Sequence, residues 1–228
     1  MNDDLASAQP VPTAEDVRAL FTRSDGTYRF ARWGRPLVPA FFGMAEPVEA
    51  VWTEALKAVA SMCGLEIAEE DPELSSNFLV FIVNRWDELR SVPSMFKLIP
   101  DLERLLGVLA ASGANQYRIY GFAPGAEGKP AAIRICVTLI RRDEEIGRGN
   151  EGGLALGQCV QGLLLWSDHA FTSESPVAEI AGVGRAMVKP RYLQVIRAAY
   201  APELPDATDD PSHAERIVAV AGDAAGAA

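Results

Sequence analysis

Residues 77–84 read Asn-Phe-Leu-Val-Phe-Ile-Val-Asn, and this stretch decides the fold class. A nearly continuous run of apolar residues between two asparagines is typical of a strand that is buried on both faces, because a half-exposed strand alternates apolar and polar side chains. Such a strand lies inside a sheet that helices cover. The segments on either side are therefore expected to include helices.

The flanking segments alternate between helix-like and strand-like patterns. Residues 47–63 carry apolar residues at steps of three and four, with Pro47 near the start and Gly64 just past the end, which predicts a helix. Further helices are expected over 101–111, over 154–164 and after Pro190, and strands over 116–122 and 131–140. Residues 28–42 alternate as a strand, and their two prolines favour an edge position. This order predicts an α/β (α+β) fold with a mixed sheet of about four to five strands and packed helices.

The ends of the chain are poor in large apolar residues. Residues 1–15 are expected to be a flexible leader and residues 205–228 a flexible tail. Residues 16–204 then form a single α/β domain, which is within the size that one hydrophobic core supports.

The segment 157–168 has the spacing of a zinc-protease helix without its ligands. A His-Glu-x-x-His helix would place His at 157, Glu at 158 and His at 161, so that two imidazoles bind the metal and the carboxylate activates its water. The chain has Gly157, Gln158 and Gln161 instead. Neither glycine nor an amide supplies this chemistry, so no metal site, no catalytic residue and no cofactor are predicted.

Several pieces of the chain, in this order, resemble an uncharacterised proteobacterial family of predicted lipoproteins. The pieces are 32–36, 63–67, 77–83, 137–140, 161–168 and 192–204. The family's core helix resembles a degenerate metzincin motif, Glu-Glu-x-x-Gln-x-x-Gly-x-x-Asn-Asp. In this chain only Gln161 and Asp168 match it, since the other motif positions hold Gly157, Gln158, Leu164 and Ser167. The resemblance implies a degenerate metzincin-like domain, with Met187 at the place of the metzincin Met-turn.

A candidate binding pocket follows from this frame. Its residues are Gln158, Gln161, Asp168, His169 and Met187. Gln161 is expected to point to the place of the missing metal and to contact the segment around Met187, because a buried amide needs hydrogen-bond partners. Asp168 with His169 is the alternative acid–base pair, although a histidine at a helix end is more often a cap or a surface group. Cys159 is too far from His169 along one helix to be its nucleophile.

The composition restricts the class of protein. The 228-residue chain is 49% apolar with a net charge of −10, which favours a soluble acidic protein and disfavours nucleic acid as a partner. Three cysteines in separate apolar stretches suit buried thiols. No membrane-spanning segment is expected. The chain as given predicts a cytoplasmic location, and a periplasmic or envelope location if the N-terminus is incomplete or processed.

The function hypotheses follow from the empty ligand frame. The favoured one is a non-catalytic pseudo-hydrolase, a pseudo-protease domain that binds another protein or acts in assembly. An enzyme of unknown reaction, using a pocket around Gln161, Asp168 and His169, is the first alternative. An envelope-associated protein is the second, if the true start lies upstream.

Overall fold

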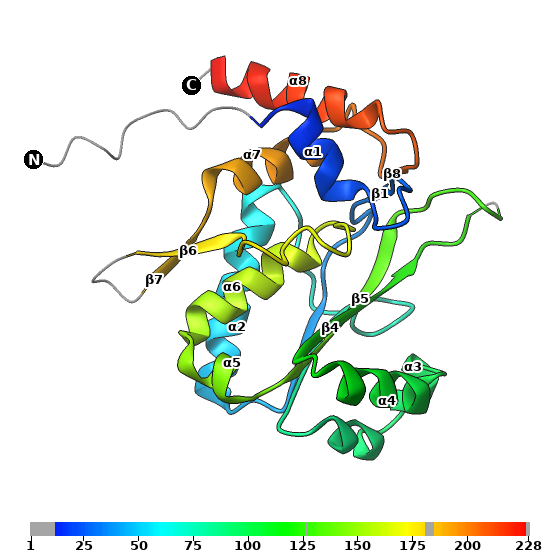
Figure 1. Ribbon diagram of the computed structural model, residues 1–228, viewed down its shortest axis with the longest axis vertical. Coiled ribbons are helices and arrows are strands. Elements are labelled where there is room, and N and C mark those ends of the chain that lie inside the picture. Colours follow the sequence, from blue (N-terminus) through cyan, green and yellow to red (C-terminus); the bar gives the residue numbers. More distant parts are fainter. Residues whose placement is uncertain (1–11, 126, 181–184, 227–228) are drawn as a thin grey trace, which may run out of the picture.

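The main sheet has four strands in the order β2-β3-β5-β4. The structure is a computed structural model that describes residues 12–125, 127–180 and 185–226 (Figure 1). The strands are β2 (Pro39–Phe42), β3 (Phe78–Val83), β4 (Gln116–Phe122) and β5 (Ile133–Arg141). β2, β3 and β5 are parallel, whereas β4, at the edge, runs antiparallel to β5. The predicted α/β class, with a mixed sheet and packed helices, is confirmed.

The apolar run of β3 is continuous because helices cover both faces of the sheet. All six residues of β3 are buried, and alternate side chains enter two separate hydrophobic clusters. One cluster lies under α2 (Glu46–Met62), α6 (Glu151–Gly162) and α7 (Pro190–Ala199). The other lies under the 3-10 helix η1 (Trp86–Ser91), α3 (Met95–Leu98) and α4 (Leu102–Ser112). Figure 1 shows these two groups of helices on opposite sides of the sheet.

Local signals set the helix boundaries where the sequence predicts them. Pro47 lies in the first turn of α2, and Gly64 follows the helix with φ of +70°. Gly113 ends α4 in the left-handed conformation, with φ of +69°. Glycine adopts this conformation without the steric strain of a Cβ atom, so both residues are effective stops. The predicted helices over 47–63, over 101–111 and after Pro190 are confirmed within one or two residues.

The predicted edge strand over 28–42 divides into two elements. Its second part is β2, which is an edge strand as expected. Its first part is wrong as a strand of this sheet, since β1 (Phe30–Ala31) pairs antiparallel with β8 (Ala207–Thr208). The partner of β1 therefore comes from the far end of the chain.

The expected flexible tail over 205–228 is wrong for the part that the structure describes. Helix α8 (His213–Gly226) packs against α1 (Ala14–Phe21) and α7, and Ala214, Ile217 and Ala221 belong to the core. Small residues at helical spacing let neighbouring helices approach closely, so one large side chain, Ile217, with two buried alanines is enough to dock the tail. Figure 1 shows α8 alongside α1.

The N-terminal boundary also differs from the expectation. Residues 1–11 lie outside the described residues, but the predicted leader over 1–15 includes the start of α1. Thr13 caps this helix, since its hydroxyl accepts a hydrogen bond from the Asp16 backbone N–H at 3.1 Å. The Asp16 carboxylate accepts in return from the Thr13 backbone N–H at 3.0 Å. This capping box begins the helix two residues before the predicted domain boundary.

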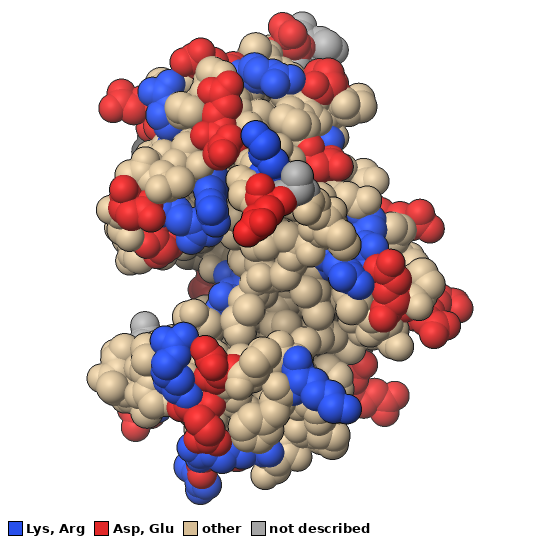
Figure 2. Space-filling model, turned by 90° about the vertical axis from the view of Figure 1, so that its right-hand side faces the viewer, with Lys and Arg blue, Asp and Glu red and all other residues tan. Residues whose placement is uncertain are grey.

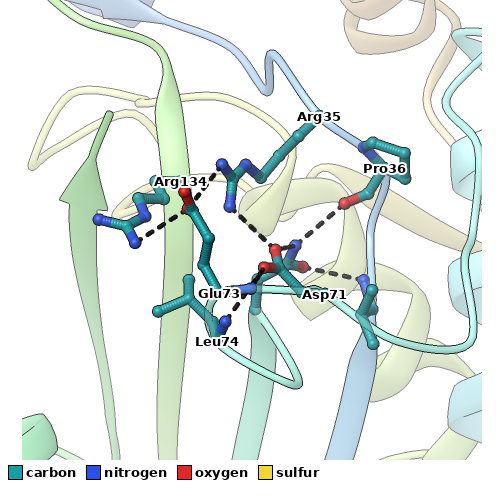
Figure 3. Close-up of polar contacts among 8 residues, drawn as sticks. Arg35, Pro36, Asp71, Glu73, Leu74 and Arg134 are labelled. Carbon is teal, nitrogen blue, oxygen red and sulfur yellow. Dashed lines mark hydrogen bonds and ion pairs between the residues drawn. The ribbon is translucent and has the colours of Figure 1, made fainter. Parts of the chain in front are cut away.

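A buried polar network fixes where β2 and β3 begin (Figure 3). The Asn77 amide oxygen accepts from the Val38 N–H at 2.9 Å, and its nitrogen donates to Asp71 at 2.9 Å. Arg35 forms an ion pair with the same Asp71 carboxylate at 3.0 Å. Burial opposes ionisation of Asp71, but hydrogen bonds from the following turn and from Asn77 lower its pKa to about 2. The asparagine before β3 therefore joins two neighbouring strands through a charged carboxylate.

Two segments between the predicted elements have structure of their own. The charged segment over 141–153 contains α5 (Glu144–Arg148) and the first residues of α6. Residues before α7 form the hairpin of β6 (Val177–Ile180) and β7 (Arg185–Val188), which packs on α6. Among the described residues, no helix is long and apolar enough to cross a membrane.

Candidate functional site

A pocket of about 600 Å³ lies between the edge strand β4 and helix α6. Residues 165–172, which follow α6, form the third wall of the pocket. In Figure 2 the molecule is hollowed at mid-height, between an upper and a lower part. The lining residues are Arg23, Gln116, Tyr117, Arg118, Ile119, Tyr120, Phe122, Gln158, Gln161, Leu165, Trp166, Ser167, Asp168, Phe171 and Thr172. Three of the five predicted pocket residues, Gln158, Gln161 and Asp168, are among them.

Helix α6 is held in place by its first residues and by its contact with the sheet. The Asn150 side chain caps it, accepting a hydrogen bond from the Gly152 N–H at 2.8 Å. At Gly162 a Cβ atom would come within 2.6 Å of the Phe78 ring, so glycine is needed for the close approach to β3. This approach turns Gln158 and Gln161 toward β4. The position of the missing first ligand, Gly157, lies instead beside Val177 of β6.

Arg118 of β4 lies between the two glutamines of the frame. Its Nη2 donates to the Gln158 Oε1 at 2.5 Å, and its Nη1 donates to the Gln161 Oε1 at 3.1 Å. The Nε donates to Thr138 of β5 at 3.3 Å. Of the ion pairs formed between described residues, none includes Arg118. Among the described residues, all hydrogen-bond partners of the guanidinium are therefore neutral.

The two glutamines differ in burial and in the number of their partners. Gln158 is 3% exposed, and its amide nitrogen also donates to the Gln116 Oε1. Gln161 is half-buried, and among the described residues its side-chain oxygen accepts from Arg118 alone. The expectation that Gln161 contacts the segment around Met187 is wrong, because β4 rather than that segment faces it. The chain of hydrogen bonds joins Gln116, Gln158, Arg118 and Gln161.

Tyr120 holds the end of α6 against β4. Its hydroxyl donates toward the carbonyls of Gln161, at 2.8 Å, and Leu164, at 3.0 Å. The Gln161 carbonyl is among the last of α6, which have no partner within the helix, and Leu164 follows the helix end. Burial raises the pKa of Tyr120 far above its ordinary value, so the hydroxyl remains a neutral donor.

The residues in the frame do not fit a metal ion. Zinc sites in proteins are built from thiolate, imidazole and carboxylate ligands. Among the described residues, no group of three or more His, Cys, Asp or Glu side chains is placed to hold a metal. The guanidinium of Arg118 lies next to both amide oxygens of the frame, and its positive charge repels a cation there.

Asp168 and His169 lie together but do not form a catalytic pair with a nucleophile. The His169 Nδ1 lies 3.2 Å from the Asp168 Oδ1. Ser24 donates its hydroxyl and its backbone N–H to Asp168, at 2.5 and 3.0 Å. These hydrogen bonds from Ser24 are the main reason that the pKa of Asp168 falls to about 2. The serine hydroxyl therefore contacts the aspartate rather than the histidine, and a carboxylate of such low pKa is a weak base for activating it.

The other predicted residues lie away from the pocket. His169 is not among the lining residues. Met187 lies in β7, is 46% exposed and is also outside the pocket, so its grouping with Gln161 is wrong. Cys159 is fully buried, and its burial raises the pKa of the thiol far above the ordinary value. This cysteine is therefore a core residue and not a thiolate nucleophile.

The sequence analysis missed the strand side of the pocket. Gln116, Arg118 and Tyr120 alternate along a strand that the sequence does predict, so they share one face of it. This alternation of polar residues is a detectable signal. It does not tell which helix covers that face, and the contacts span about 40 residues of sequence, as between Arg118 and Gln158.

Comparison of the chain with protein-family models, with curated proteins and with solved structures finds no match. The argument for function therefore rests on the pocket and on its surroundings.

Proposed function

We propose that this protein is a non-catalytic, degenerate metzincin-like domain that binds a segment of another protein in the pocket between β4 and α6. The observation that carries the proposal is Arg118, whose guanidinium lies between Gln158 and Gln161. A permanent cation stands beside the two positions where a zinc protease would have a general base and a metal ligand. The same frame is therefore suited to binding and not to hydrolysis.

The free edge of β4 supports a protein partner. Arg141 donates its N–H to the Asn115 carbonyl at 2.8 Å. The alternation of an antiparallel ladder then directs the backbone groups of Gln116, Arg118 and Tyr120 away from β5. An unpaired strand edge is a template for an extended segment of another chain, with backbone hydrogen bonds for affinity and side-chain pockets for specificity.

Exposed aromatic side chains on the same strand add to this support. Phe122, 41% exposed, lies opposite Ile133 on the pocket side of β4, whereas Tyr117, 43% exposed, lies opposite Leu139 and projects from the other face of the same edge strand. Large amphipathic or aromatic residues are enriched at protein interfaces, where they bury much area for little loss of conformational entropy. A surface that combines a free strand edge, exposed aromatic rings and an adjoining pocket is suited to an extended protein segment.

The enzyme alternative has less support from the geometry. Its residues are Gln161, Asp168 and His169, of which only the first two line the pocket. The Asp168 carboxylate is engaged by Ser24, and its low pKa keeps it ionised and a weak base at neutral pH. Binding is therefore the function that we propose.

Site-specific photo-crosslinking tests the proposal. A photoreactive benzoylphenylalanine replaces Tyr117 at the exposed edge of β4, and in a matched control it replaces Val108 of α4, which is 53% exposed outside the pocket. After irradiation in cells of the source organism, a discrete protein adduct is expected at position 117 and not at 108. Adding Arg118→Lys to the 117 variant should reduce that adduct. No adduct at 117, or the same adducts at both positions, would contradict the proposal.

A further inference from the structure

Arg118 retains hydrogen-bonding capacity toward the pocket. The hydrogen bonds to the two glutamines and to Thr138 use three of the five N–H groups of its guanidinium. The planar guanidinium has two further N–H groups, and its shape and charge match a carboxylate. The neutral amides orient the guanidinium without neutralising it.

Other donors line the same pocket. Arg23 is half-buried there, and within the described chain its side chain has no hydrogen-bond or ion-pair partner. The Ser167 hydroxyl is buried, in a residue that is 8% exposed, and has no hydrogen-bond partner in the described part of the chain. Gln161 uses its oxygen for Arg118, which leaves its amide N–H groups for a ligand. A buried donor without a partner is uncommon, and a missing ligand is one physical explanation for it.

The pocket differs in charge from the rest of the molecule. The chain has a net charge of −10, yet the charged residues that line the pocket are two arginines and one aspartate. That aspartate, Asp168, already accepts hydrogen bonds from Ser24 and contacts His169. The remaining positive charge is therefore concentrated at the two arginines, and it favours an anion.

We propose that the occupant's anchoring group is a carboxylate that pairs with Arg118, carried by the extended partner segment, with apolar atoms next to it packed on the aromatic wall. This inference rests on the proposed function and adds the chemistry of the partner. The wall is formed by Trp166 and Phe171, whose rings meet edge to face at 5.1 Å between centroids. An acidic side chain and a C-terminal carboxylate both supply the same group.

The position of α6 favours a carboxylate over a phosphate. Phosphate groups are usually bound at helix N-termini, where backbone N–H groups and the helix dipole favour negative charge. The pocket faces Gln158 and Gln161, near the C-terminal end of α6, where the dipole disfavours a doubly charged group. One arginine fork balances a single negative charge at this place.

A titration followed by NMR tests the anchoring group. The probes are N-acetyl-phenylalanine, which has a free carboxylate, its neutral amide, and inorganic phosphate. The readout is the side-chain Nε–Hε resonance of Arg118, assigned by its loss in Arg118→Lys. We expect a saturable shift with the carboxylate probe, and with neither the amide nor phosphate.

Three variants separate the charge effect from loss of the fold. Arg118→Lys should weaken binding of the probe, followed by Trp166 fluorescence, about tenfold or more, because lysine has no planar fork. Arg23→Gln removes no recorded contact of the fold and should weaken it about twofold to fivefold. Arg85→Gln, at an exposed arginine paired with Asp87 outside the pocket, should leave the affinity unchanged.

The outcomes distinguish this inference from the proposed function. An equal response to the amide, a stronger response to phosphate, or no response of Arg118 to any probe would overturn the carboxylate assignment. An unchanged affinity in both Arg118→Lys and Arg23→Gln would overturn it as well. If photo-crosslinking at position 117 captures a partner while the titrations fail, the protein-binding function stands without this anchor.

Discussion

Replacing Gln158 tests whether the polar chain in the pocket stabilises the fold. Gln158 is 3% exposed, accepts from Arg118 at 2.5 Å and donates to Gln116. Gln158→Ala removes both hydrogen bonds. A bond to a charged group contributes about 1.5–3 kcal/mol and a neutral one about 1 kcal/mol, so a loss of about 2–4 kcal/mol in the free energy of unfolding is expected.

Gln161→Ala is the matched control on the same helix. Gln161 is half-buried and accepts one longer bond from Arg118, at 3.1 Å, so its replacement should lower the free energy of unfolding by about 1.5 kcal/mol, the lower end of the range for a bond to a charged group. Both substitutions replace glutamine with alanine within α6, so the difference in helix propensity is the same and cancels. Gln158→Leu restores much of the side-chain volume but not the hydrogen bonds, and should remain destabilised by about 1.5–3 kcal/mol.

Urea denaturation at neutral pH, followed by tryptophan fluorescence, measures all three variants. The denaturation midpoint should fall most in Gln158→Ala with an unchanged dependence on urea, since the surface exposed on unfolding is the same. The reasoning is refuted if Gln161→Ala is as destabilising as Gln158→Ala. It is also refuted if Gln158→Leu is as stable as the wild type, because the bond to Arg118 would then contribute nothing.

Three further predictions concern the C-terminal helix and the frame. Ile217 is fully buried on α8, so Ile217→Ala should lower the free energy of unfolding by about 2–4 kcal/mol in a urea melt. Val108→Ala, at an exposed site, should lower it by under about 0.5 kcal/mol. Equal effects would mean that α8 is not docked. Burial is the main reason that the pKa of His213 falls from 6.5 to about 4, so the unfolded chain binds more protons than the folded one between these values. The free energy of unfolding should therefore decrease as the pH is lowered from 6.5 to about 4, by at most about 1.4 kcal/mol per pH unit. His213→Leu should flatten this part of the stability profile, and an unchanged profile would contradict the assignment. After incubation with zinc and gel filtration, elemental analysis should find far less than one zinc per chain, because the Arg118 guanidinium lies at the frame; about one zinc per chain would show that this geometry is wrong.

Much of the fold was predictable because its signals are local. The run of β3 predicts a strand buried on both faces from six consecutive side chains. The bounds of α2 follow from Pro47 and Gly64, and the end of α4 follows from Gly113. In each case the decisive residues lie within a few positions of one another, where backbone conformation and periodicity act.

Local signals did not predict the parts of the fold that depend on contacts between segments far apart in the sequence. The tail was expected to be flexible because residues 205–228 include few large apolar side chains, yet Ile217 and two alanines of α8 are buried against α1 and α7. Arg32 shows the same dependence, since its guanidinium is bound by Asp206 at 2.8 Å and by carbonyls at the end of α7 and beyond. Whether a weakly apolar helix docks depends on the shape of the surface that it meets, which its own sequence does not contain.

The candidate site divides in the same way. The spacing of Gln158 and Gln161 on one helix, and of Gln116, Arg118 and Tyr120 on one strand, could be read from the sequence, because each set repeats with the period of its own element. Only the tertiary structure brings the two sets together and leaves Met187 on a separate hairpin. Placing β5 between β3 and β4 positions the edge strand beside α6, and this strand order sets which polar side chains meet. The sequence by itself therefore determined the strands of the main sheet, the helices α2, α4, α6 and α7, and the absence of the zinc-protease ligands from the frame. The packing of the sheet against α6 decided that an arginine faces the two glutamines.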